Sequence, residues 1–165
     1  KLLTQRNWKN VRLPNEHLHQ SKVESINKGV KKMIEDFTKA WFGNLHKMRE
    51  KFTKKHPQNY KEIVEAVVEI LKTDDEYSCP DKERIHEIDD GNYQGTLVYV
   101  IGAGGYQPDT YWYVKVGYGS CSSCDTLEAI TEYSIDDPTK EQVDQYMTLA
   151  LHIVQGLKKM GDEIV

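Results

Sequence analysis

The sequence predicts an α+β fold in which a small antiparallel three-stranded meander packs against helices in the order α-α-β-β-β-α-α. Apolar residues recur at steps of three and four over residues 23–52, 63–71 and 143–157, a spacing typical of helices. Between these regions, residues 84–88, 96–101 and 110–116 are β-prone and are separated by turn sequences. A chain of 165 residues has the length of one ordinary domain, so we expect these elements to form one cooperative unit.

The first predicted helix is long and basic. Ser21 and Glu24 have the spacing of a capping box, which predicts that the helix begins at Ser21. The apolar stripe stays in phase from Val23 to Phe52 across Gly43, which favours one long helix. Thirty helical residues span about 45 Å, more than the rest of so small a domain can cover. Part of the stripe is therefore expected to meet another chain, and a homo-oligomer formed through this helix is one form of that contact.

A second helix and the meander follow. Asn59 is expected to cap a helix that ends near Leu71, and residues 74–81 are predicted to form a loop that contains Cys79. Asp90-Gly91 is a turn signal between the first two strands. Because side chains alternate along a strand, the last strand should have one buried face and one partly open, tyrosine-bearing face. The buried face would carry Trp112, Val114 and Val116, and the open face Tyr111, Tyr113 and Lys115.

Two helices are predicted at the end of the chain. Asp125 and Glu128 have capping-box spacing, so a short helix should begin after Asp125. Pro138 is suited to the first position of the last helix, and Gly161 to its end.

Charge divides the chain into two sections. Residues 1–57 carry 14 Lys/Arg and five Asp/Glu, whereas residues 58–165 carry eight and 21. We interpret these as a basic N-terminal helical arm, 1–57, and an acidic α+β domain, 58–165. Such asymmetry suggests contact of the basic section with nucleic acid or an acidic protein, or a head-to-tail arrangement. A solvated, lysine-rich helix surface is the alternative.

The cysteine count and the hydropathy bear on the compartment. Three cysteines are an odd number and too few for a disulfide scaffold, which favours a reducing compartment. No stretch has the apolar length of a membrane span, and no leader is visible, so we expect a cytoplasmic protein without a membrane partner.

Cys121-Ser122-Ser123-Cys124 is the most distinctive chemical motif. It lies between a strand end and a helix start, where backbone amides stabilise a thiolate, so Cys121 and Cys124 could form a dithiol redox site. A thioredoxin-like enzyme would, however, need a βαβ framework, which this element order lacks. A Cys3His zinc site built from Cys79, His86, Cys121 and Cys124 is the second interpretation. The third is that both motif cysteines only pack a glycine-rich turn.

Other catalytic signatures are missing from the sequence. Residues 102–105 are glycine-rich but lie between two strands, whereas a dinucleotide fingerprint requires a following helix. No Walker sequence, nucleophile elbow or HExxH motif occurs. Surface contact is therefore the better functional interpretation, and no cofactor is predicted unless the zinc site forms. The candidate interaction residues are Tyr111, Tyr113, Lys115, Trp41, Lys31 and Lys32.

The segment from Tyr111 to Leu127, an aromatic strand that runs into Gly-Ser-Cys-Ser-Ser-Cys-Asp, resembles small uncharacterised proteins of tailed phages and of some other viral or microbial genomes. The resemblance covers residues 58–135 and leaves out the basic arm. It implies a phage-type accessory protein that acts on a host or defence protein, such as an anti-CRISPR-like factor, inside the host cell. It carries no catalytic residue.

The leading hypothesis is thus a non-enzymatic protein-interaction module and, by the resemblance, a phage-type inhibitor. A dithiol enzyme that uses Cys121 and Cys124 is the first alternative, and a zinc-stabilised nucleic-acid-binding protein led by the basic arm is the second.

Overall fold

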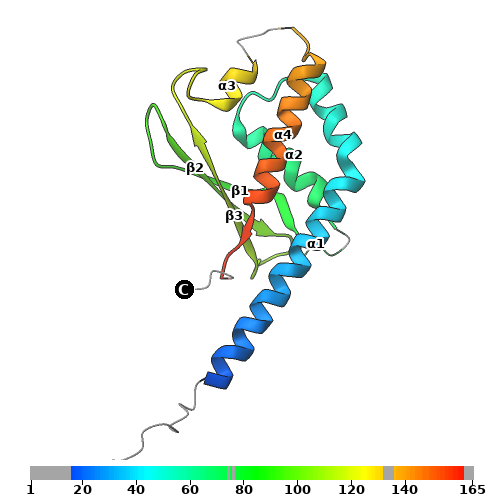
Figure 1. Cartoon of the computed structure of the whole chain (residues 1–165), viewed down its shortest axis with the longest axis vertical. Coiled ribbons are helices and arrows are strands. Elements are labelled where there is room, and N and C mark those ends of the chain that lie inside the picture. The colour runs from blue at the N-terminus through cyan, green and yellow to red at the C-terminus, as the bar shows by residue number, and fades with distance from the viewer. Residues whose placement is uncertain (1–15, 74, 76, 132–135, 162–165) are drawn as a thin grey trace, which may run out of the picture.

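One layer of helices covers one face of a four-stranded antiparallel sheet (Figure 1). The computed structural model describes residues 16–73, 75, 77–131 and 136–161, with side chains from Ser21 onward. The helices are α1 (Glu16–Lys54), α2 (Tyr60–Leu71), α3 (Thr126–Thr131) and α4 (Lys140–Gly156). The strands are β1 (Pro80–Asp89), β2 (Gly95–Ala103), β3 (Tyr111–Tyr118) and β4 (Lys158–Lys159). The α+β class and the long N-terminal helix are confirmed, and the sheet has one strand more than predicted.

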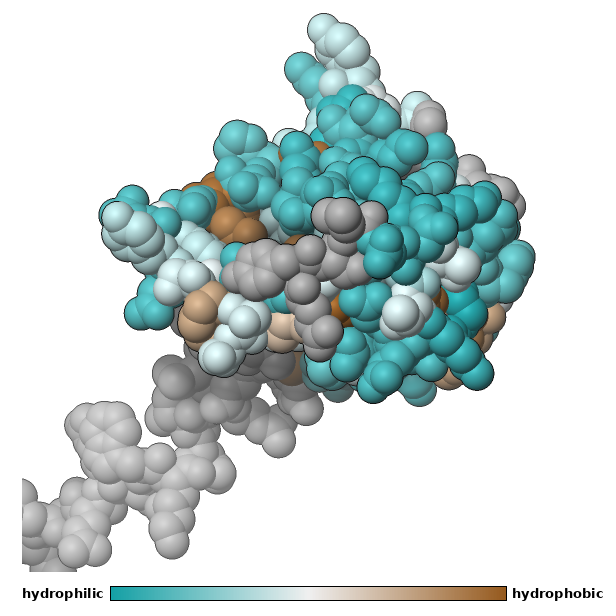
Figure 2. Space-filling view, turned by 90° about the horizontal axis from the view of Figure 1, so that it is seen from above, coloured by the Kyte–Doolittle hydropathy of each residue, from teal (hydrophilic) through white to brown (hydrophobic). Residues whose placement is uncertain are grey.

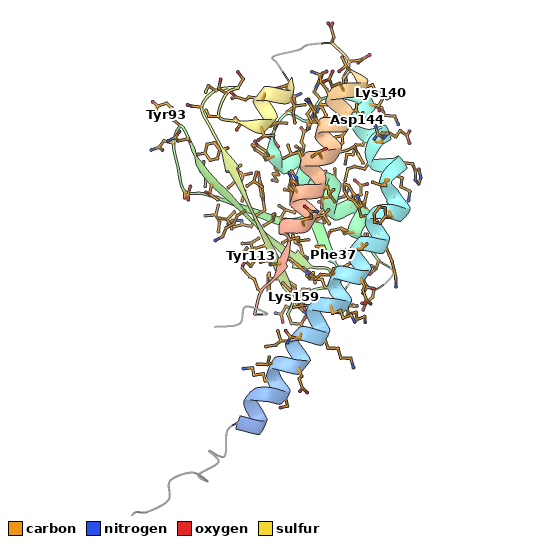
Figure 3. The ribbon with its side chains drawn as sticks, in the orientation of Figure 1. Phe37, Tyr93, Tyr113, Lys140, Asp144 and Lys159 are labelled. Atoms are coloured by element: carbon orange, nitrogen blue, oxygen red, sulfur yellow. The ribbon has the colours of Figure 1, made fainter. Side chains whose placement is uncertain are left out.

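Helix α1 is one continuous helix of 39 residues, and its first half projects away from the body (Figure 1). The continuity across Gly43 is confirmed. The predicted start at Ser21 is wrong, because the helix already includes Glu16 and Ser21 lies inside it. The buried part of the stripe begins at Phe37, which marks where α1 reaches the body (Figure 3). From there α1 packs against α2 and α4.

The sheet has the strand order β1-β2-β3-β4, and every neighbouring pair is antiparallel. The predicted face alternation of β3 is confirmed, because Trp112, Val114 and Val116 are buried whereas Tyr111 and Lys115 are exposed. Opposite them on β2, Ile101, Tyr99 and Leu97 extend the same helix-facing side. The other side of the sheet is not covered by any helix of the described residues (Figure 1).

The end of the chain departs most from the prediction. Helix α4 begins at Lys140 rather than at Pro138, because the Thr139 side chain accepts the Gln142 amide and the Gln142 side chain accepts the Thr139 amide. This reciprocal pair stabilises the start of the helix. The helix ends at Gly156 instead of Gly161.

After Gly156 the chain turns into β4, which the sequence did not predict. Lys158 and Lys159 pair with Tyr113 and Trp112 of β3, and the Met160 amide donates to the Tyr111 carbonyl at 2.8 Å. Tyr113 and Lys159 accordingly lie at the same end of the sheet (Figure 3). Two residues are too few to produce a strand pattern in the sequence.

A single hydrophobic cluster unites the described elements. It combines Phe37, Trp41, Met48 and Phe52 of α1 with apolar residues of α2, β2, β3, α3 and α4. Residues on both sides of position 57 therefore share one core. The surface seen from above is largely hydrophilic, with small hydrophobic areas between the polar ones (Figure 2). None of the described helices has the length and apolarity needed to cross a membrane.

Candidate functional site

The cysteine motif forms a tight corner between β3 and α3. The Cys121 carbonyl accepts the amides of Cys124 and Asp125, both at 2.8 Å, which closes a turn. This turn brings the Cys121 and Cys124 sulfur atoms to 2.8 Å, and the Cys121 amide lies 3.1 Å from the Cys124 Sγ. Both thiols are free and exposed. The predicted dithiol pair is therefore within reach of solvent and of a reaction partner.

The corner also favours ionisation of Cys124. Hydrogen bonding from the Cys121 thiol is the main cause of a lowered pKa of Cys124. Desolvation opposes it, and the backbone amides of Cys121 and Ser120 lower the pKa further. A thiolate is the nucleophilic and metal-binding form of cysteine. Cys124 is thus the cysteine of the pair that the local contacts activate.

Asp125 has a structural role in this corner. Its carboxylate is buried and accepts hydrogen bonds from the Gly119 amide at 3.0 Å, the Tyr60 hydroxyl at 3.0 Å and the Glu128 amide at 2.9 Å. The last of these is the predicted cap at the start of α3, and the others tie the corner to β3 and α2. The Tyr60 hydroxyl in turn accepts the Leu127 amide at 3.2 Å. Asp125 therefore holds the corner in place rather than offering a free acid.

The four residues of the predicted zinc site are not brought together. Cys79 is buried just before β1, whereas His86 is exposed on β1 and the other two cysteines lie at the corner after β3. Within the described ranges, no three His, Cys, Asp or Glu side chains are close enough to hold a metal ion. Cys79 behaves as a small apolar core residue, which is the usual role of a buried cysteine.

The predicted interaction residues fall into three environments. Tyr111 and Lys115 are exposed on the uncovered side of the sheet, with Tyr113 half-buried between them. Lys31 and Lys32 are exposed on the projecting half of α1. Trp41 is only 6% exposed and lies in the core, so its prediction as an interaction residue is corrected. The apolar stripe changes from half-buried at Val23–Val30 to core-facing from Phe37 onward, a change that periodicity alone does not reveal.

The structure also contains a pocket that the sequence did not predict. It has a volume of about 690 Å³ and lies beside the cysteine corner, with Gly119 and Asp125 in its wall. Tyr60 of α2, Tyr99 of β2 and Tyr118 of β3 line it as well. The one local feature of the sequence that bears on this pocket is the strand alternation, which places Tyr99 on the helix-facing side of the sheet. Nothing local indicated that the three tyrosines would meet.

Comparison of the chain with protein-family models, curated proteins and solved structures finds no match.

Proposed function

We propose that this protein is a non-enzymatic protein-interaction module, and that the projecting half of α1 is its principal contact surface. The observation that carries this proposal is the long helix itself. Apolar residues continue along α1 at Val23, Ile26 and Val30, before the helix reaches the hydrophobic cluster at Met33 and Phe37. An amphipathic helix gains most of its stability from packing its apolar face, and among the described residues this stretch has no core to pack on.

The charges around this stripe support contact with an acidic protein. Lys22, Lys28, Lys31 and Lys32 are all exposed on the same half of α1. Complementary charge raises the rate of association and selects among partners. The acidic section 58–165 of a second copy would also be complementary, so self-association is one form of the same contact. The resemblance of residues 111–127 to phage proteins connects the module to phage-type inhibitors of host or defence proteins.

The test replaces two stripe residues with acids. In the Ile26→Asp, Val30→Asp variant, we expect loss of the partner that wild-type protein recovers in a pull-down from candidate host lysates. Because α1 packs on the body only from Met33 onward, the far-ultraviolet circular dichroism and thermal midpoint of the body should be retained. Sedimentation of the purified wild type over a range of concentrations will show whether the partner is a second copy.

A matched control makes the same change of charge off the stripe. Ser25→Asp with Asn27→Asp adds the same two negative charges at exposed positions outside the stripe, keeps every lysine of this surface, and should weaken binding much less. Equal loss in both variants would indicate a purely electrostatic contact and contradict the role of the stripe. Turnover of a substrate without any stoichiometric partner would contradict the proposed function as a whole.

A dithiol enzyme is the second candidate, favoured by the 2.8 Å separation of the two sulfurs and by the lowered pKa of Cys124. In the reaction, Cys124 attacks a partner disulfide and Cys121 resolves the mixed disulfide. The two cysteine thiols are oxidised to one disulfide, and the partner disulfide is reduced to two thiols.

The pH dependence of alkylation separates this candidate from the first. We expect Cys124 to react with iodoacetamide at a pH below that of an ordinary cysteine, and Cys121→Ser to move the profile upward. Cys79→Ser is the control, since Cys79 is buried away from the corner. A Cys124 profile like that of a free cysteine would remove the basis for this candidate.

A further inference from the structure

The pocket beside the cysteine corner is independent of the projecting helix and is strongly acidic. Its volume of about 690 Å³ lies within the usual range of small-ligand sites. Glu87 and Asp89 line it from β1, and Asp125 and Glu128 line it from the start of α3. Lys61 is the one Lys or Arg among the described lining residues, and it is exposed. Formally, four carboxylates against one ammonium leave a charge of −3 around the pocket.

Two of these acids already have partners. Asp125 holds the corner through its three hydrogen bonds. Asp89 accepts the Tyr118 hydroxyl at 2.8 Å and the Gly91 amide at 3.0 Å, both on the same oxygen. The hydrogen-bonding groups that remain for a ligand are therefore the carboxylates of Glu87 and Glu128 and the hydroxyl of Tyr99.

Two atoms of these groups are buried. Tyr99 is 0% exposed, and its hydroxyl has no partner at ordinary hydrogen-bond geometry within the described part of the chain. Burial and, after it, the carboxylate of Glu87, which faces Tyr99 across the strand pair, raise the pKa of Tyr99. The hydroxyl proton is therefore directed toward Glu87, and its oxygen remains free to accept from a ligand. The Glu128 Oε2 is likewise buried, and none of the residues that the structure describes gives it a hydrogen bond. Leaving a buried polar group unpaired costs stability, and native proteins contain few such groups. Both atoms belong to residues that line the same pocket, so a single ligand with N–H donors could satisfy both.

The rest of the lining restricts the kind of cation. No group of the described residues has the arrangement needed for a metal ion. Leu97, Leu127 and Pro57 supply apolar surface, and the tyrosine rings supply faces that attract organic cations. A cation with an aliphatic body fits this combination better than a small, strongly hydrated ion.

We propose that this pocket binds an alkylammonium or guanidinium group, whose N–H donors pair with the Glu128 carboxylate and the Tyr99 hydroxyl while its aliphatic part contacts the apolar wall. A free small amine and the Lys or Arg side chain of a partner protein share this chemistry. Glu87 adds a further carboxylate at the solvent side of the pocket, since its side chain is exposed on the same strand face.

The experiment measures binding of defined probes to the full chain by NMR titration. The cationic probes are butylamine, 1,5-diaminopentane and the blocked amino acids N-acetyl-lysine and N-acetyl-arginine methylamide. Butanol and butyrate are the neutral and anionic probes of the same length. We expect saturable shifts of pocket amides with the cations, and affinity that falls as salt rises. Preference for the blocked amino acids over the simple amines would identify a protein side chain as the source.

Variants test the assigned atoms. Glu128→Gln should weaken binding of the cations about tenfold, and Tyr99→Phe, which removes only the hydroxyl, about threefold. Glu83→Gln, an exposed acid on β1 outside the pocket, is the matched control and should bind unchanged. The thermal midpoint of each variant is first compared with that of the wild type. If a variant does not fold, Glu87→Gln takes its place, and its affinity for the cations is expected to fall about threefold.

Two results would overturn the proposal. One is an affinity for butanol equal to that for butylamine. The other is the absence of a saturable shift with every cationic probe at about 10 mM, ten times the dissociation constant of a weak site. If Glu128→Gln and Tyr99→Phe both bind the cations as tightly as the wild type, the assignment of the binding atoms to Glu128 and Tyr99 would also be overturned. Because Ile26→Asp, Val30→Asp leaves the pocket intact, amine binding to that variant separates this site from the contact proposed for α1.

Discussion

Gly119 is the residue on which the cysteine corner depends most directly. A Cβ atom at this position would lie 2.5 Å from the Cys124 carbonyl oxygen and 2.6 Å from the Cys124 Sγ. Backbone cannot move aside as a flexible side chain can, so a larger residue must displace the turn. Displacement would also break the hydrogen bond from the Gly119 amide to the buried Asp125 carboxylate.

We therefore predict that Gly119→Ala lowers the free energy of unfolding by about 1–3 kcal/mol, as overpacking with loss of a buried hydrogen bond does. Urea denaturation followed by circular dichroism measures the change. Gly117→Ala is the control, because a Cβ there meets nothing within 4 Å. That control should be neutral or slightly stabilising in a strand. Equal effects of the two substitutions would show that the corner is not tightly packed.

Asp89 and Tyr118 give a pH-dependent contact at the rim of the pocket. The Gly91 amide, followed by the Tyr118 hydroxyl, lowers the pKa of Asp89. The same hydrogen bond raises the pKa of Tyr118 to about 12. A lowered folded-state pKa for an acid means that its stabilising effect is present above the unfolded-state pKa and is lost as the pH falls through the folded-state pKa.

Tyr118→Phe is accordingly predicted to raise the pKa of Asp89 part of the way to its ordinary value. The remaining depression comes from the Gly91 amide. Titration of the Asp89 side-chain carboxyl by carbon-13 NMR provides the measurement. The stability difference between wild type and variant should be present at neutral pH and shrink once Asp89 is protonated. An unchanged Asp89 pKa would show that the hydrogen bond from the Tyr118 hydroxyl does not stabilise the Asp89 carboxylate in solution.

At the scale of the elements, patterns confined to a few residues predicted the structure well. Asp125 caps α3, and the faces of β3 alternate, because both features depend on neighbours in the sequence. The predicted start of α1 and both predicted ends of α4 were wrong, and at the start of α4 a competing local contact won. At α4 this was the reciprocal pair of Thr139 and Gln142, which the proline signal at Pro138 obscured.

The two exposed glycines of α1 test where the cooperative body begins. A Cβ at Gly29 or at Gly43 would meet nothing within 4 Å, so alanine should raise helix propensity equally at both. Only Gly43 lies in the half of α1 that packs against the body, since the contacts with the core begin at Met33. The projecting half of α1 can lose its helical structure while the body stays folded. A higher helix propensity at Gly29 therefore need not raise the free energy of global unfolding.

We predict that Gly43→Ala raises the free energy of unfolding by about 0.5–1 kcal/mol, while Gly29→Ala increases helical circular dichroism with little change in the denaturation midpoint. Urea denaturation at low protein concentration, where self-association is minimal, measures both. Equal midpoint shifts would show instead that all of α1 unfolds as one unit with the body.

At the scale of the whole molecule, the sequence could not predict the pocket. Tyr60, Tyr99 and Tyr118 come from α2, β2 and β3, and only the folded arrangement of these elements places all three in the wall of one pocket. Each tyrosine has an ordinary local setting. Of the four acids of the pocket, the sequence pattern assigns only Asp125 and Glu128, as a capping pair, because charge patterns do not reveal which carboxylates share a cavity.

His56 provides another long-range connection of the same kind. It is buried between α1 and α2, with its Nδ1 2.7 Å from the Tyr146 hydroxyl and its Nε2 2.9 Å from the Asp136 carbonyl oxygen. A carbonyl can only accept, so Nε2 carries the proton. In the neutral ring, Nδ1 then accepts from Tyr146, and one imidazole links the α1–α2 connection to α4 and to the segment before it.

Tyr146→Phe keeps the volume of the core but leaves the buried Nδ1 without its donor. We predict a loss of about 1–3 kcal/mol in the free energy of unfolding, which urea denaturation measures. Tyr111→Phe, at a 39% exposed position, is the control and should change stability by less than about 0.5 kcal/mol. Nitrogen-15 NMR of the imidazole adds a readout of the connection itself: Nε2 should stay protonated in both proteins, while the Nδ1 resonance shifts in Tyr146→Phe. An unchanged Nδ1 resonance would show that the histidine does not accept from Tyr146 in solution.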